Sequence, residues 1–159
     1  MKKPNALGFT LVELLVVIVI IGILAAVVFV ALDPGRRFGE SRDATRWSEV
    51  NSVLNGVLKY QVDNDGDLPT DIDSASTTNQ VLGTNGAGCD SGCTDGGATE
   101  GDCADLTSEL VDTYLASIPQ DPKTGSAGFT DYYINKTASG RITVGACDPE
   151  QASSISVTR

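Results

Sequence analysis

The sequence predicts an α+β protein: a long N-terminal α-helix whose first half can span a membrane, followed by a small antiparallel β-sheet. Three observations lead to this prediction. An unbroken apolar run extends from Leu14 to Leu32, and helical periodicity continues from Arg36 to Asn64. Residues 130–158 are rich in β-branched and aromatic side chains. A chain of 159 residues has room for one such anchored domain.

The apolar run is long enough to cross the ~30 Å hydrocarbon core of a bilayer as a helix rising ~1.5 Å per residue. One carboxylate, Glu13, lies at its start. A charged side chain costs roughly 2.5–3.5 kcal/mol at the centre of a spanning helix and less near an end. Glu13 therefore requires a partner or a function.

The N-terminal segment resembles that of type IV pilins and of the related secretion pseudopilins. The matching residues are Gly8, Phe9, Thr10, Leu11, Val12, Glu13, Leu14 and Leu15, then Ile20, Ile21, Gly22, Ile23, Leu24, Ala25 and Ala26. The resemblance implies the pilin fold, a helical spine that carries a small sheet. It divides the chain into a leader (1–8), a membrane and filament-core helix (9–32), an amphipathic half of the spine (33–64) and a globular head (65–159).

The same resemblance implies a processing route. A prepilin peptidase would cut between Gly8 and Phe9 and methylate the new amine of Phe9. Glu13 would then pair with the Phe9 amine of a neighbouring subunit, because pairing relieves the desolvation cost of both charges. The implied partners are identical and related pilin subunits, the peptidase, an inner-membrane assembly platform, and lipid before assembly. A plain signal-anchor helix is the alternative, and it predicts an uncut Gly8–Phe9 bond.

The basic residues around the apolar run favour the opposite orientation. Lys2 and Lys3 precede it, whereas Arg36, Arg37, Arg42 and Arg46 follow it. The positive-inside rule alone would place the C-terminal side in the cytoplasm. The leader resemblance and the cysteines favour a head outside the cytoplasm. We therefore expect a single-pass membrane protein that later enters an extracellular filament at the cell surface.

The chain is acidic and has no histidine. Its formal net charge is −10, and removal of Lys2 and Lys3 with the leader makes it −12. From residue 47 onward, five Lys and Arg stand against seventeen Asp and Glu. Such a head repels phosphate backbones, so nucleic-acid binding is not expected. Catalytic arrangements that need His are impossible, no phosphate loop is present, and the carboxylates are expected to be solvated, which together predict a non-enzyme.

Four cysteines predict two disulfides, because an even number in a small exported domain is typical of disulfide bonding. They are Cys89, Cys93, Cys103 and Cys147. A zinc site is disfavoured by the C-x3-C spacing and the lack of His. Of the three connectivities, we favour Cys89–Cys93, a tight local loop, with Cys103–Cys147.

The second half of the spine is predicted to be amphipathic. Asp33, Pro34 and Gly35 should interrupt the helix before it resumes. The apolar face holds Phe38, Trp47, Val50, Val53, Leu54, Val57, Leu58 and Val62, and the opposite face holds Arg42, Asp43, Arg46, Glu49 and Lys59. We expect the apolar face to pack on the sheet. The four arginines should be solvated or pair with acidic heads of neighbours, rather than form a DNA-binding patch.

Residues 63–67, Asp-Asn-Asp-Gly-Asp, have the composition of a calcium loop. An EF-hand places Gly sixth and Glu twelfth, where this chain has Leu68 and Ser74. We therefore expect the end of the helix and a turn. No cofactor or metal is expected, and a calcium site, as the major pseudopilins have, is the alternative.

The rest of the head is predicted from turn and strand signals. Residues 73–104 are so polar that we expect a long exposed loop without a core. A short helix is expected over 105–117, capped by Asp105 or Thr107 and ended by Pro119 and Pro122. Strands are expected at 130–135 and 141–146 around a turn at 138–140, with an edge strand within 153–158.

The sequence thus predicts a structural subunit of a type IV pilus, and the disulfides favour this function. A pseudopilin is the first alternative, favoured slightly by Ile118-Pro119-Gln120-Asp121-Pro122. The second is a minor pilin that binds DNA or a surface.

Overall fold

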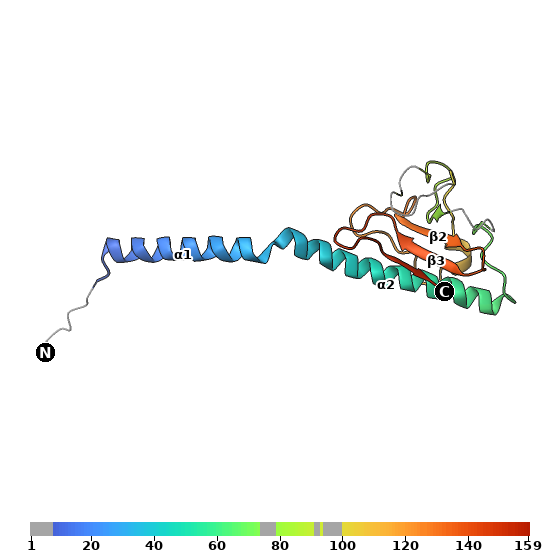
Figure 1. Cartoon of the computed structure of the whole chain (residues 1–159), viewed down its shortest axis with the longest axis horizontal. Helices are drawn as coiled ribbons and strands as arrows, with labels where there is room; N and C mark the ends of the chain where they lie inside the picture. Colours follow the sequence, from blue (N-terminus) through green and yellow to red (C-terminus); the bar gives the residue numbers. More distant parts are fainter. Residues whose placement is uncertain (1–7, 74–78, 91–92, 94–99) are drawn as a thin grey trace. The chain divides into compact units, whose positions relative to one another are not determined.

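The computed structural model describes residues 8–73, 79–90, 93 and 100–159, and the chain forms two compact units, Met1–Phe38 and Gly39–Arg159 (Figure 1). The elements are α1 (Leu11–Leu32), α2 (Pro34–Asp63), β1 (Gln80–Val81), α3 (Thr107–Leu110), β2 (Tyr132–Lys136), β3 (Ile142–Ala146) and β4 (Ser156–Thr158). The four strands form one antiparallel sheet in the order β1-β2-β3-β4. The predicted α+β fold of the pilin type is confirmed.

The break in the helix is narrower than predicted. Only Asp33 leaves the helical conformation, with φ 39° and ψ 71° in the left-handed region. Pro34 becomes the first residue of α2, a position where a proline is tolerated because its missing N–H would have no intrahelical partner. The side chain of Asp33 accepts a hydrogen bond from the N–H of Arg36 at 3.4 Å. A single residue therefore separates α1 from α2.

The core of the second unit lies between α2 and the sheet. Val50, Val53, Leu54 and Val57 are fully buried and pack with buried sheet residues, which are Tyr132, Ile134, Ile142 and Val144. The prediction that this face packs on the sheet is confirmed. It was wrong for Phe38, Trp47 and Val62, which are exposed. Phe38 and Val62 lie five residues from Asp43 and Val57 and so fall off the buried stripe, whereas Trp47, three residues before Val50, lies at its edge and is partly exposed.

The C-terminal hairpin matches the prediction closely. β2 and β3 pair Tyr133 with Gly145 and Ile134 with Val144. At the turn, the N–H of Thr137 donates to the carbonyl of Arg141 at 2.7 Å, and Gly140 adopts a φ of 82°. β4 is an edge strand, as expected, and pairs Val157 with Val144. Local strand and turn signals thus placed three of the four strands.

The expectation of a coreless loop over 73–104 was wrong. Within its described residues, β1 pairs with β2, and a set of apolar side chains is buried: Val81, Leu82, Cys89, Cys93, Cys103 and Ala104. The N–H of Leu82 donates to Tyr132 and that of Ala104 to Val81, both at 2.8 Å. Backbone pairing with distant residues therefore builds a second cluster. Residues 74–78, 91–92 and 94–99 of the predicted loop lie outside the described residues.

The predicted helix over 105–117 is reduced to one turn. It ends at Leu110 because Val111 is extended and Asp112 adopts a φ of 70°. The N–H of Asp112 then donates to the carbonyl of Leu115 at 2.8 Å, closing a tight turn. Asp105 does accept a hydrogen bond from the N–H of Thr107 at 3.0 Å, although the residue that precedes the helix is Leu106.

Candidate processing and assembly site

The predicted cleavage site lies just before α1. Gly8, Phe9 and Thr10 are exposed and outside any helix or strand, and the side chain of Phe9 is 88 % exposed. Exposed backbone that is not tied into secondary structure is the preferred substrate of proteases. The Gly8–Phe9 bond therefore lies in exposed backbone, and its cleavage stays a prediction.

Glu13 forms a reciprocal cap with Thr10. The N–H of Thr10 and its hydroxyl both donate to Glu13 Oε2 at 2.8 Å, and the N–H of Glu13 donates to Thr10 Oγ1 at 3.2 Å. This capping box satisfies backbone groups that the first turn of a helix leaves unpaired. This capping box was not predicted from the sequence, although the Thr-x-x-Glu spacing is its usual signal. Within one chain, the carboxylate of Glu13 is thus turned back toward the residue that follows Phe9.

The remaining surface of α1 is apolar and uncovered. α1 contains no buried residue, and its exposed side chains include leucines, isoleucines, valines and Phe29. In the described part of the chain, the helix that begins at Leu11 is the one that is long and apolar enough to cross a membrane. So large an apolar surface needs lipid or other helices around it. Together with the motif reported below, this is consistent with a membrane-anchored precursor.

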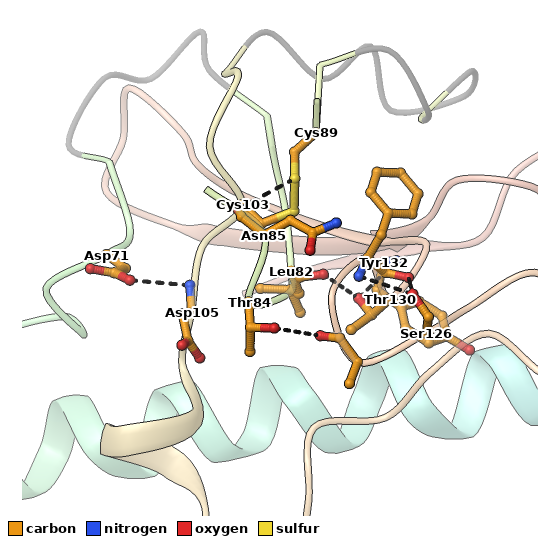
Figure 2. Close-up of a disulfide and its surroundings, with 12 residues drawn as sticks. Asp71, Leu82, Thr84, Asn85, Cys89, Cys103, Asp105, Ser126, Thr130 and Tyr132 are labelled. Carbon is orange, nitrogen blue, oxygen red and sulfur yellow. Dashed lines mark hydrogen bonds between the residues drawn. A yellow bond between two sulfur atoms is a disulfide. The ribbon is translucent and has the colours of Figure 1, made fainter. Parts of the chain in front are cut away.

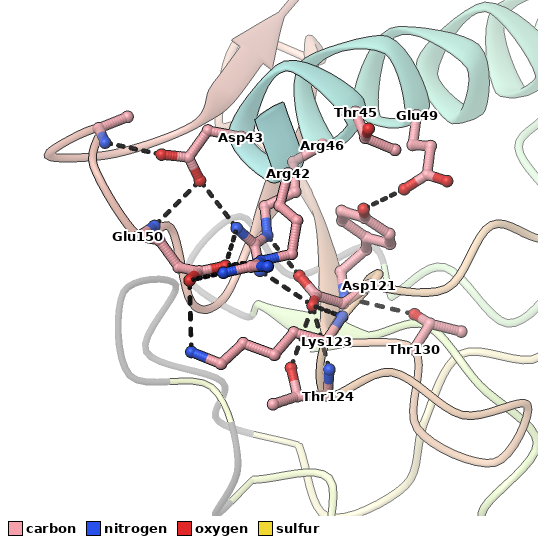
Figure 3. Close-up of polar contacts among 12 residues, drawn as sticks. Arg42, Asp43, Thr45, Arg46, Glu49, Asp121, Lys123, Thr124, Thr130 and Glu150 are labelled. Atoms are coloured by element: carbon pink, nitrogen blue, oxygen red, sulfur yellow. Dashed lines mark hydrogen bonds and ion pairs between the residues drawn. The ribbon is translucent and has the colours of Figure 1, made fainter. Parts of the chain in front are cut away.

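A buried charged cluster joins α2 to two loops of the head (Figure 3). Arg46 is fully buried and binds Asp121 with two bonds, Nε to Oδ2 at 2.5 Å and Nη2 to Oδ1 at 3.0 Å. Its Nη1 also lies 2.8 Å from Asp43 and 3.1 Å from Glu150. Arg42 binds Glu150 in the same bidentate way, at 2.5 and 2.6 Å.

This cluster corrects two expectations. Arg42 and Arg46 are paired inside their own chain, rather than solvated or available to neighbouring heads. Asp43 and Asp121 are buried carboxylates, not solvated ones. The sequence did carry a signal, because Asp43 and Arg46 precede Val50 by seven and four residues and so continue the buried stripe of α2.

Asp43 fastens the segment 150–152 to α2. Its carboxylate accepts the backbone N–H groups of Glu150, Gln151 and Ala152 at 2.9, 2.7 and 2.9 Å. Burial alone would raise the pKa of Asp43, but these N–H groups and Arg46 lower it below its usual value. For Glu150, the hydrogen bonds from Arg42 are the main cause that lowers its pKa to about 2.

Asp121 holds the second loop in the same way. Beyond Arg46, its Oδ1 accepts the N–H groups of Lys123 and Thr124 at 2.8 and 3.2 Å. Burial opposes the charge of Asp121, but Arg46 and these donors keep its pKa lowered. Near this loop, Tyr132 donates its hydroxyl to Glu49, and burial raises the pKa of Tyr132. The cluster thus locks the loops at 121–124 and 150–152 onto α2.

All four cysteines form disulfides, but the favoured pairing was wrong. Cys89 bonds to Cys103 and Cys93 to Cys147, with Cα–Cα distances of 5.4 and 4.7 Å. Figure 2 shows the first of these disulfides. The backbone explains it, since the N–H of Cys89 donates to the carbonyl of Gly101 and that of Cys103 to the carbonyl of Asn85, both at 3.0 Å. Both bonds are buried, and Phe129 and Tyr133 pack against them.

No metal centre is formed by the residues that the structure describes: none of their His, Cys, Asp and Glu side chains gather in a group of three or more suited to an ion. The segment 63–67 is the end of α2 followed by a turn, as expected, in which the N–H of Gly66 donates to Gln61 at 2.8 Å. The expected absence of a metal, with calcium as the alternative, stays an untested prediction.

Comparison with known proteins identifies the N-terminal segment. The family model of the prokaryotic N-terminal methylation motif matches residues 3–29, a range that contains Gly8, Phe9 and Glu13. No match was found among curated proteins or among solved structures. The match covers part of the leader and most of α1. This chain therefore carries the N-terminal methylation motif, the signature of type IV pilins and pseudopilins.

Proposed function

We propose that the chain is a structural subunit of a type IV pilus. It is inserted in the membrane as a prepilin, cut between Gly8 and Phe9, methylated on Phe9 and assembled into a helical filament. The observation that supports this most is the methylation motif at residues 3–29, which lies on an exposed apolar helix with no buried residue. The motif also points to a structural protein that assembles with other pilin subunits.

The chemistry of assembly follows from two charges. Cleavage gives Phe9 a free amine, and Glu13 carries a carboxylate near the start of the apolar helix. In the single chain, this carboxylate accepts hydrogen bonds from the N–H and the hydroxyl of Thr10. In low-dielectric surroundings the Glu13 carboxylate is stable only next to an opposite charge, and the Phe9 amine of a neighbouring subunit supplies it. If the two helices shift along each other, both the carboxylate and the amine lose their partner. The pair therefore sets the axial stagger of neighbouring subunits.

The head suits a surface outside the cytoplasm. Two disulfides persist in an oxidising environment, and the Arg46 cluster ties loops that are distant in sequence. We accordingly place the head outside the cytoplasm, in a single-pass precursor first and at the filament surface afterwards.

The experiment that tests this function is mass spectrometry of the N-terminus of chain purified from membranes and from sheared surface filaments. We expect a chain that starts at Phe9, with or without a methyl group, in both fractions. A chain that starts at Met1 in cells with active prepilin peptidase would contradict the proposal and indicate a signal-anchored surface domain.

A pseudopilin of a secretion system is the second candidate, favoured by the Ile118–Pro122 segment. The amount of chain in the sheared fraction distinguishes the two, because a pseudopilin filament stays short and is scarce outside the cell. A DNA-binding minor pilin would require binding by the head at physiological salt, which the acidic charge disfavours.

A further inference from the structure

Between residues 41 and 58, α2 turns its charged side chains toward the head and leaves an uncharged face outside. In this stretch, the exposed residues are Ser41, Ala44, Thr45, Trp47, Ser48, Ser52 and Asn55. The charged residues of this stretch are Arg42, Asp43, Arg46 and Glu49. They are buried or half-buried, and each binds a side chain or a backbone N–H of the protein's own head. A surface helix ordinarily has the reverse pattern, with charges toward water. We call these seven exposed residues the outer face of α2.

The outer face is the part of α2 where two copies can approach with least repulsion. From residue 47 onward the chain has five basic residues against seventeen acidic ones, so two heads repel each other over most of their surface. Like charges brought together at an interface cost several kcal/mol, and an uncharged contact avoids that cost. The charge pattern thus favours a second copy of this chain as the partner of the outer face.

Two apolar features that differ in shape lie on this face or next to it: the protruding ring of Trp47, which belongs to the face, and a groove beside the face. Trp47 is 40 % exposed. Further along α2, a groove of about 550 Å³ has apolar walls made by Leu58, Val62 and Tyr114, with a polar rim of Asn55, Lys59, Asp63 and Thr113. Val62 is 81 % exposed, and the ring of Tyr114 is supported edge-on by Tyr60, with ring centroids 5.8 Å apart. The groove is therefore a preformed site for an apolar side chain.

Trp47 and the groove are too far apart along α2 to meet within one chain, so a contact between them joins two copies. Leu58 and Val62 follow Trp47 by 11 and 15 residues, which places them on the same side of α2 and about 16–22 Å further along its axis. Trp47 therefore cannot reach the groove of its own chain. A knob and a groove at different places on one molecule make a head-to-tail interface, which propagates into a helical filament when the rotation between copies does not close a ring.

We propose that Trp47 of one subunit docks into the groove of Leu58, Val62 and Tyr114 of another copy, with the outer face forming the surrounding contact. Tryptophan is the residue type that most often dominates such interfaces. The inference rests on the proposed function as a filament subunit and adds a contact of the second unit to the one that α1 makes.

The test uses the full chain expressed in its native cells in place of the original copy. The variants are Trp47→Ala and Ser52→Glu, with Ser154→Glu as a matched control at an exposed position far from α2 in sequence. Each is scored for chain level, for cleavage to Phe9 and for sheared filament. In parallel, a photoreactive benzoyl-phenylalanine replaces Trp47, and adducts between copies are mapped by mass spectrometry.

We expect both outer-face variants to be cleaved normally but to give at least ~10-fold less filament, the effect of losing ~1.4 kcal/mol or more per contact. The control should match the wild type, and the adducts should map to residues 58–63 or 113–114. Wild-type filament yields from both variants, or adducts elsewhere, would overturn the docking proposal alone. An absence of filament and of cleavage in the wild type would overturn the proposed function with it.

Discussion

Arg46 and Asp121 are 75 positions apart in sequence, yet their side chains are joined by two hydrogen bonds and neither is accessible to solvent. The guanidinium also binds Asp43 and Glu150, so one cation is surrounded by three carboxylates. Its removal would leave Asp43 and Asp121 buried without a cationic partner, whereas Glu150 would keep Arg42. The stability of the head therefore depends on this single side chain more than on any surface ion pair.

The variant Arg46→Ala is expected to destabilise the chain by about 3–5 kcal/mol, the usual cost of removing one member of a buried ion pair. Guanidinium unfolding of the detergent-solubilised chain, followed by fluorescence of its single tryptophan, measures this. Arg42→Gln is the control, because its pair with Glu150 is partly exposed and exposed pairs contribute only about 0–1 kcal/mol. Equal losses in the two variants would contradict the special role of Arg46.

Low pH should lower the folding stability of the head through the same charged cluster. The pKa of Asp43, Asp121 and Glu150 is lowered in the folded chain, to about 2 for Glu150. A carboxyl group with a lowered pKa stabilises the fold above its usual pKa, and that contribution is lost as the pH falls through the folded value. We therefore expect the melting temperature to drop between pH 4.5 and about pH 2. In Glu150→Gln, the fall in melting temperature should be smaller. A pH dependence of the melting temperature equal to that of the wild type would argue against the lowered pKa of Glu150.

Asp131 should have the opposite effect on how the stability of the head depends on pH. It is buried, and burial followed by the nearby carboxylates Asp148 and Asp121 raises its pKa. A carboxyl group with a raised pKa costs stability once the pH exceeds its unfolded value, so its charge opposes folding at neutral pH. Asp131 also has a φ of 61°, which asparagine tolerates well. Asp131→Asn should therefore raise the melting temperature at pH 7 and change it little at pH 3.

The two disulfides should contribute unequally. They close loops of 54 and 14 residues, and the chain-entropy model assigns about 4 kcal/mol to the longer and about 3 kcal/mol to the shorter. The paired variant Cys93→Ser with Cys147→Ser should thus lower the melting temperature more than Cys89→Ser with Cys103→Ser. Peptide mapping of the unreduced protein should recover Cys89 with Cys103, and a Cys89–Cys93 peptide would contradict the structure.

Glu13→Ala should separate processing from assembly. The substitution leaves Gly8 and Phe9 in place, so we expect cleavage and membrane levels close to those of the wild type. Assembly should fail, because the Phe9 amine of the neighbour loses its partner, a loss of about 3–5 kcal/mol for a buried pair. Electron microscopy of sheared material provides the measurement. Filaments of normal number and diameter would mean that Glu13 serves only its cap with Thr10.

Local patterns in the sequence were enough to predict most of the helices and strands. They were insufficient to predict the contacts between residues that are far apart in the sequence. α1 follows from one apolar run, and the β2–β3 hairpin from side chains next to a glycine turn. β1 has only two residues and exists because Gln80 pairs with Ile134, so no local pattern announces it. The disulfide pairing likewise depends on backbone bonds that bring residues 85–89 beside 101–103.

The candidate processing and assembly residues could be named for a different reason. Gly8, Phe9 and Glu13 lie within the N-terminal methylation motif, whose residue types and spacing are visible without a structure. Arg46 was misassigned because charge alone suggested solvent, whereas its position four residues before Val50 placed it inside. A charged residue that continues a buried stripe is better interpreted by its position than by its polarity.

The three hydrogen bonds from residues 150–152 to Asp43 also impose an order in time. Asp43 is synthesised more than a hundred residues before its three backbone partners. Until residues 150–152 have been translated, Asp43 has no backbone N–H groups to bind and Arg42 has no Glu150. A chain stalled before residue 150 therefore keeps these charges on α2 without the partners that neutralise them in the folded head.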